Sequence, residues 1–152
     1  MAAYGDVDEL NAVIGVARAH VRADLSRLLL GVQQDLFAIG AQLADPTRKV
    51  ASRRSKAAVS DSRVRRLEKA IDTREARLAP LRAFVTPGGP PSAAHLHVAR
   101  AVCRRAERSV VTLARDVEVD ARIVVYLNRL SDLLFVLARS EGLRAGTTED
   151  RW

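Results

Sequence analysis

The stretch at 97–108, HVARAVCRRAER, places four arginines and one glutamate within an apolar helical pattern. On an α-helix, Arg100, Arg104 and Arg108 follow one another at four-residue intervals and share a face, which also carries Glu107. A guanidinium group keeps its proton and presents several N–H donors in one plane, so it suits phosphate or carboxylate. This face therefore fits a polyanion, and the alternative is a solvated helix face held by salt bridges.

Two polar residues interrupt the apolar pattern at 121–139. Asn128 and Asp132 lie four residues apart there, and buried polar groups cost free energy unless they find partners. We expect the Asp132 carboxylate to bind an arginine of the 97–108 stretch. Asn128 offers an amide that can both donate and accept a hydrogen bond.

A loop rich in proline and glycine precedes the arginine stretch. Residues 84–92 read FVTPGGPPS, and we expect Ser92 to be the N-cap of the helix that follows. The loop is either a simple connector or a backbone that approaches a ligand closely. Phe84 is accordingly either a core residue or part of a pocket wall.

Apolar residues at helical spacing predict the elements that position these side chains. We expect helices over 4–20, 24–44, 61–78, 93–116 and 121–139, with Asp6 as the N-cap of the first. Alternating β patterns are missing and aromatic residues make up only 4% of the chain, so the fold class is all-α with an aliphatic core. Residues 1–152 are expected to form a single domain, with a loose tail at 141–152.

Positive charge is concentrated in one part of the chain. The net charge is +7, and residues 47–66 hold eight of the 25 basic residues and one of the 18 acidic ones, so the remainder carries 17 of each. We expect a flexible basic loop at 47–60, without aromatic residues that stack on bases. A basic helical nucleic-acid-binding or scaffold module is an alternative from a different class, and we expect no nucleic-acid partner.

Cysteine and histidine usage argues against a disulfide or metal framework. Cys103 is the only cysteine. His20, His95 and His97 lack the spacing of a metal site, so we interpret them as ordinary helix residues and expect no protein metal ligands. No signal peptide and no membrane-spanning apolar run is visible, which predicts a soluble cytoplasmic protein without a membrane partner.

Three blocks, taken together, resemble the ATP:cob(I)alamin adenosyltransferases of the trimeric, propanediol-utilisation type. The blocks are YGDVDELNAVIG at 4–15, FVTPGG with SAAHLHVARAVCRRAER between 84 and 108, and YLNRLSDLLFVLAR at 126–139. The resemblance implies a five-helix bundle with a ferritin-like up-down arrangement, assembled as a homotrimer with active sites between adjacent subunits. It also implies transfer of the 5′-deoxyadenosyl group of ATP to Co(I) of cobalamin, which gives adenosylcobalamin and triphosphate.

The resemblance also assigns roles to individual residues. It implies ATP binding by Arg104, Arg105, Glu107, Arg108 and Asn128. Phe84 and Asp8 would contact the corrinoid, Phe84 would displace the lower ligand of cobalt, and Asp8 would form a salt bridge with Arg100 across the subunit interface. No side chain acts as the nucleophile, because Co(I) does so, and Arg104 and Phe84 position the substrates.

Further substrates and partners follow from the same resemblance. It implies ATP with Mg2+ and a reduced corrinoid as substrates, and a cobalamin reductase and an adenosylcobalamin-dependent enzyme as partners. The family's N-terminal phosphate-binding segment, of the form TxxGDxGxTxLxxGxRxxK, has no counterpart before the first predicted helix. A catalytically impaired ATP- or corrinoid-binding protein of the same fold is therefore an alternative.

Overall fold

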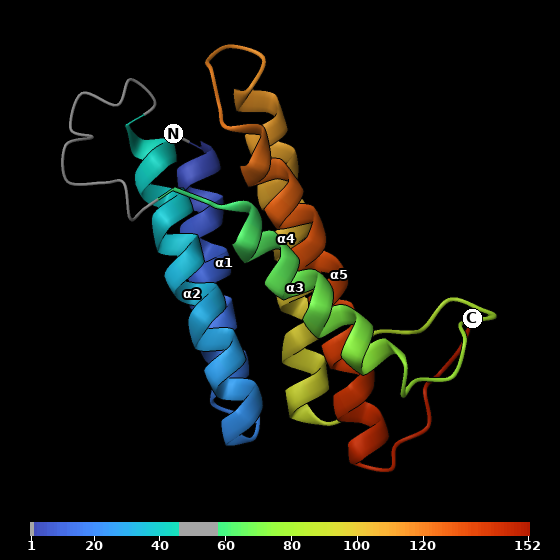
Figure 1. Cartoon of the computed structure of the whole chain (residues 1–152). Helices are drawn as coiled ribbons and strands as arrows, with labels where there is room; N and C mark the ends of the chain where they lie inside the picture. The colour runs from blue at the N-terminus through green and yellow to red at the C-terminus, as the bar shows by residue number, and fades with distance from the viewer. Residues whose placement is uncertain (1, 46–57) are drawn as a thin grey trace.

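The computed structural model describes residues 2–45 and 58–152, which form five α-helices (Figure 1). These are α1 (Ala2–Arg18), α2 (Ala23–Ala44), α3 (Asp61–Glu75), α4 (Pro91–Leu113) and α5 (Ala121–Arg144). Successive helices run in opposite directions, as Figure 1 shows. The predicted all-α class with five helices is confirmed. The predicted basic loop at 47–60 lies outside the described residues except for 58–60.

Aliphatic side chains at helical spacing build the core. α4 packs most extensively against α5, α1 packs against α2 and α4, and α3 packs against α5. On α5, Ile123, Leu127, Leu130 and Leu134 are at most 1% exposed, and each such side chain stabilises the fold by about 2 kcal/mol when it leaves water. Among the described helices, none combines the length and the apolar character needed to cross a lipid bilayer.

A buried carboxylate attaches α3 to its neighbours. Asp35 of α2 is 3% exposed, and its oxygens lie 3.0 Å from Arg63 Nη1 and 2.9 Å from Arg66 Nη2. Tyr126 of α5 donates its hydroxyl to Asp35 Oδ2 at 2.8 Å. Burial, with the negative charge of Asp35 in addition, raises the pKa of Tyr126, so the hydroxyl keeps its proton and remains a donor. Two cations and one donor offset the desolvation of Asp35, and together they join three helices.

Two predicted N-caps are wrong. Asp6 lies inside α1, which already begins at Ala2, and its carboxylate accepts a hydrogen bond from the Ser109 hydroxyl of α4 instead. α4 begins at Pro91, and no side chain caps it. Proline suits the first helical turn because its missing N–H would have no partner there. Ser92 is therefore a buried residue of the first turn.

The C-terminal part of the chain is more ordered than its sequence predicts. α5 continues to Arg144, where the guanidinium of Arg144 donates to buried Glu141 at 2.9 Å. Arg139 is also buried and lies 2.6 Å from Glu149, while its Nη2 donates to the Ala79 carbonyl at 3.0 Å. These contacts bind residues beyond 139 to the bundle.

The last residues pair with the loop that carries Phe84. The backbone N–H of Thr86 donates to the Asp150 carbonyl at 2.8 Å, and the N–H of Trp152 donates to the Phe84 carbonyl at 3.1 Å. The prediction of a loose tail at 141–152 is therefore wrong, because its first residues are helical and its last residues form an antiparallel bridge.

Candidate active site

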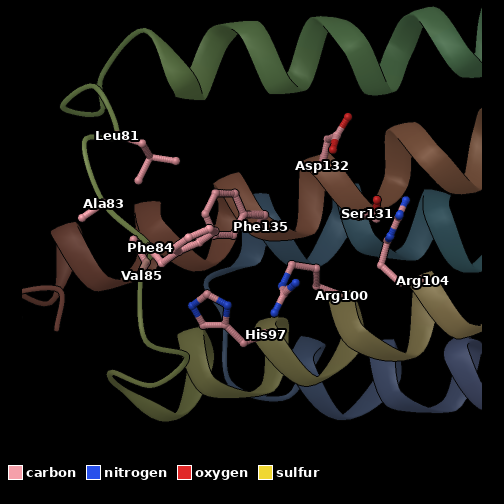
Figure 2. A pocket seen from close by; sticks show the side chains of 10 residues that line it. All are labelled: Leu81, Ala83, Phe84, Val85, His97, Arg100, Arg104, Ser131, Asp132 and Phe135. Atoms are coloured by element: carbon pink, nitrogen blue, oxygen red, sulfur yellow. The ribbon is translucent and has the colours of Figure 1, made fainter. Parts of the chain in front are cut away.

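A cavity of about 530 Å³ opens between the loop after α3 and the facing sides of α4 and α5. The loop, α4 and α5 each contribute to its wall, which consists of Leu81, Ala83, Phe84, Val85, His97, Arg100, Arg104, Ser131, Asp132 and Phe135. Figure 2 shows the apolar side chains gathered at one end and the charged ones at the other. The cavity therefore suits a ligand that is apolar at one end and anionic at the other.

Aromatic side chains form the apolar end. Phe84 is 75% exposed, and its ring lies 6.2 Å from that of Trp152. Phe135 of α5 also lines the cavity (Figure 2). Phe84 is therefore not a core residue, and its exposed ring forms part of the cavity wall.

His97 and Arg100 occupy the middle of the cavity, both packed on Phe135. The His97 ring meets the Phe135 ring edge to face at 6.1 Å, and Arg100 Cζ lies 5.9 Å from the centre of the same ring. Burial, and then the positive charge of Arg100, lower the pKa of His97, which is therefore neutral at pH 7. Within the described residues, His97 Nδ1 and Arg100 Nε are buried without a hydrogen-bond partner.

Arg104 and Glu107 define the charged end. Arg104 Nη1 donates to Glu107 Oε2 at 2.6 Å, and Asn128 Nδ2 donates to the second Glu107 oxygen at 3.1 Å. Both oxygens of Glu107 are thus used to hold a guanidinium and an amide. Arg104 remains 48% exposed and can bind an anion while Glu107 orients it.

Asp132 does not make the contact that its sequence position predicts. Its carboxylate lies 3.4 Å from Arg129 Nη1, within α5 itself, rather than against an arginine of α4. Residues three apart on a helix lie side by side, so Asp132 binds Arg129 of its own helix rather than an arginine of α4. Asp132 and Ser131 nevertheless reach the charged end of the cavity.

Five of the eight residues implicated by the resemblance lie outside the cavity wall, and only two of these five, Glu107 and Asn128, are linked to a residue of the wall. Arg105 is bound to Glu9 and lies 3.4 Å from Asp6, so two carboxylates of α1 hold it against that helix. Arg108 and Asp8 have exposed side chains. The chain therefore brings Phe84, Arg100 and Arg104 to one cavity, with Glu107 and Asn128 linked to Arg104, and leaves the other three on the surface around α1 and α4.

His97, which its sequence context indicates to be an ordinary helix residue, lines the cavity wall, and so does Phe135, which was not predicted from the sequence. His97, Arg100 and Arg104 follow one another at three and four residues, as do Asn128, Asp132 and Phe135. This spacing is the signal that each set shares a helix face. The loop residues Leu81, Ala83 and Val85 had no comparable signal. The described residues include no group of three or more His, Cys, Asp or Glu side chains that could hold a metal ion.

Fold and site define an all-α protein with a cavity for a ligand of mixed apolar and anionic character. Residues 1–141 match the sequence model of the family described as "Cobalamin adenosyltransferase", and the chain belongs to this family. It is 39% identical to the corrinoid adenosyltransferase of Bacillus subtilis, over 94% of this chain and 74% of that protein. It is 41% identical to the corrinoid adenosyltransferase PduO of Salmonella typhimurium, over 91% of this chain but only 41% of that longer protein.

Solved structures show the same fold. A variant PduO-type ATP:corrinoid adenosyltransferase from Lactobacillus reuteri, complexed with cobalamin and ATP, superposes with a TM-score of 0.91 at 32% identity, over 99% of this chain and 84% of that one. A second variant of this enzyme, complexed with ATP, gives a TM-score of 0.89 at 33% identity, over 99% and 85%.

Proposed function

We propose that this chain transfers the 5′-deoxyadenosyl group of ATP to Co(I) of a corrinoid. The cobalt attacks the 5′ carbon, a cobalt–carbon bond forms, and the carbon–oxygen bond to the triphosphate breaks. The observation that carries the proposal is that one and the same cavity has an aromatic end and an arginine end. Family membership and relatives that bind cobalamin and ATP support it.

The charged end binds the triphosphate. Arg104 contacts a phosphate oxygen. Arg105 and Arg108 lie outside the cavity wall and bind the part of ATP that extends beyond it, Arg105 once the nucleotide has displaced Glu9 and Asp6. Triphosphate leaves with a full negative charge on its oxygen, so donors already aimed at it lower the barrier. Glu107 acts through Arg104, because a carboxylate beside phosphate is repulsive unless a cation lies between them. Asn128 presents the remaining donor and acceptor of its amide to the nucleotide.

The aromatic end receives the corrin. Phe84 lies against the macrocycle, keeps water and the lower ligand away from the cobalt, and so favours the low-coordinate state from which Co(I) forms. One of the two Lactobacillus variants has a substituted phenylalanine and the other a substituted arginine, and these two positions lie 20 residues apart, as Phe84 and Arg104 do. That spacing supports both assignments.

A second copy of the chain completes the site in a homotrimer. A cavity of about 530 Å³ is within the usual range for one small ligand, and a corrinoid together with ATP exceeds it. Asp8 is exposed on α1, and Arg100 Nε is without a partner among the described residues. Asp8 of one copy pairs with Arg100 of the next, and Asp8 then also borders the corrinoid.

The proposed reaction also requires a metal ion with ATP and two partner enzymes. ATP enters with Mg2+, which neutralises charge on the phosphates. A cobalamin reductase supplies the Co(I) state, and an adenosylcobalamin-dependent enzyme takes up the product. A cytoplasmic location fits these partners.

The test is direct. Protein, ATP and Mg2+ are mixed with chemically reduced cobalamin under anaerobic conditions, and adenosylcobalamin formation is followed by its absorbance. We expect product from the wild-type chain and a loss of at least tenfold in rate for Arg104→Ala, since a charge-assisted hydrogen bond contributes about 1.5–3 kcal/mol.

Arg122→Ala serves as the matched control, because Arg122 is an arginine of α5 with a similar exposure that is bound to Asp120 at the start of its own helix. It should keep the wild-type rate. Binding of both substrates without product would refute the proposal and identify a binding protein of the same fold.

A further inference from the structure

Arg129 lies beside the charged end of the cavity and has no part in the reaction described above. Its Nη2 donates to Asn128 Oδ1 at 3.0 Å, and its Nη1 lies 3.4 Å from Asp132 Oδ2. The Arg129 side chain is 41% exposed. One guanidinium thus holds two neighbouring side chains on the same helix.

Arg129 and Glu107 together decide which way the Asn128 amide points. A side-chain amide has an oxygen that accepts and a nitrogen that donates, and rotation by half a turn exchanges them. Arg129 can only donate and ionised Glu107 can only accept. Oδ1 must therefore face Arg129 and Nδ2 must face Glu107, as observed at 3.0 Å and 3.1 Å.

The orientation of the Asn128 amide also affects the position of Arg104, through Glu107. Glu107 uses one oxygen for Asn128 and the other for Arg104 Nη1. A rotated Asn128 would place its oxygen against the Glu107 carboxylate, which is repulsive, and Glu107 would turn away. Arg104 would then lose its orienting partner.

We propose that Arg129 is a positioning residue for nucleotide binding, which fixes the Asn128 amide and, through Glu107, the direction of Arg104. The inference rests on the proposed function, since ATP is the nucleotide. Arg129 acts through Asn128 and does not itself contact ATP.

A double-mutant cycle tests this path. Arg129→Met removes the donors at similar length, and Arg129→Gln keeps an NH2 donor group without the charge. We expect Arg129→Met to weaken ATP binding about tenfold, measured by calorimetry, because a hydrogen bond from a charged group is lost. Arg129→Gln should recover most of the affinity. In an Asn128→Ala background, Arg129→Met should cause no further loss.

Arg122→Met is the matched control. Arg122 belongs to the same helix, is 46% exposed and pairs with Asp120 instead of Asn128. It should leave ATP affinity unchanged. A tenfold loss for Arg129→Met that persists in the Asn128→Ala background would overturn the inference, because Arg129 would then bind ATP directly. Unchanged ATP affinity in Arg129→Met would overturn it as well.

A measurement without ATP separates this inference from the proposed function. The side-chain NH2 resonances of Asn128, assigned by their loss in Asn128→Ala, should shift in Arg129→Met and stay in place in Arg122→Met. If they do not move in Arg129→Met, the positioning role is refuted whatever the chain binds. A wild-type chain without affinity for ATP would refute the proposed function alone.

Discussion

Cys103 shows how packing sets the chemistry of a single residue. It lies on α4 with no exposed surface, and its thiol donates to the Leu127 carbonyl of α5 at 3.2 Å. Burial raises the pKa of Cys103 far above its ordinary value, with a smaller contribution from Glu107 in the same direction. The thiolate, which is the reactive form, is therefore scarce.

We predict that Cys103 does not react with a thiol reagent in the native protein. Titration with a chromogenic disulfide at pH 8 should give no signal over minutes, and one equivalent should appear after addition of guanidinium chloride. Rapid reaction of the native chain would show that α4 and α5 separate readily.

His97 provides a pH dependence of stability. Burial and then Arg100 lower its pKa from 6.5, while Glu149 opposes this effect. Between the lowered pKa and 6.5 the unfolded chain binds a proton that the folded chain does not. Stability due to neutral His97 is therefore complete above pH 6.5 and falls as the pH decreases toward the lowered pKa.

We predict that the free energy of unfolding in urea decreases between pH 7.5 and pH 5.5, and that His97→Gln makes this decrease smaller. The difference between the two slopes isolates His97 from other groups that titrate in this range. Equal slopes would show that His97 titrates alike in the folded and unfolded chains.

Only part of the site could be predicted from the residues. Helical spacing requires Arg100 and Arg104 to share a face, and both line the cavity. A local pattern cannot show that the loop at 81–85 returns over His97, because that depends on tertiary packing. The predicted contact of Asp132 with an arginine of α4 is wrong because of a local effect. Asp132 binds Arg129 of its own helix instead.

At the level of elements, apolar periodicity predicts all five helices, but not their ends. α1 begins before Asp6 because Ala2 and Ala3 favour helix. α5 extends beyond 139 because Glu141 and Arg144 bind each other in its last turns. The attachment of α3 could not be predicted either, since Asp35 is far from its arginine partners in sequence.

We predict that Asp35→Asn destabilises the fold by about 2–3 kcal/mol. Loss of one partner of a buried ion pair usually destabilises a protein by more than this, because the other charge is left buried. The effect is smaller here because the Arg66 guanidinium is partly exposed and water can solvate it. Tyr126→Phe should cost about 1 kcal/mol, the value of one hydrogen bond. Urea unfolding measures both, with Asp72→Asn on the exposed side of α3 as the control. A change below about 0.5 kcal/mol for Asp35→Asn would contradict the role of this contact.

At the level of the whole molecule, the proposed reaction depends on contact between copies. Asp8 and Arg100 do not meet within one chain, and the cavity is smaller than the two substrates together. In the proposed homotrimer, a neighbouring copy would supply what one chain leaves incomplete.

We predict that sedimentation velocity gives three times the mass of the chain, and that Asp8→Arg shifts the protein toward monomer by placing like charges opposite each other. Asp72→Arg, an equal charge change on α3, should leave the assembly intact. A stable trimer in Asp8→Arg would exclude the pairing with Arg100.

The bridge between the last residues and the Phe84 loop has an optical consequence. Trp152 is the only tryptophan in the chain, and its ring lies 6.2 Å from Phe84 while 91% of the residue is exposed. Its fluorescence therefore reports on a single place, at the mouth of the cavity. A corrinoid absorbs where tryptophan emits, so its arrival at Phe84 should quench that light by energy transfer, whereas ATP alone should leave it nearly unchanged. If the proposed function holds, Trp152 is thus a label-free probe that responds to the corrinoid and not to ATP.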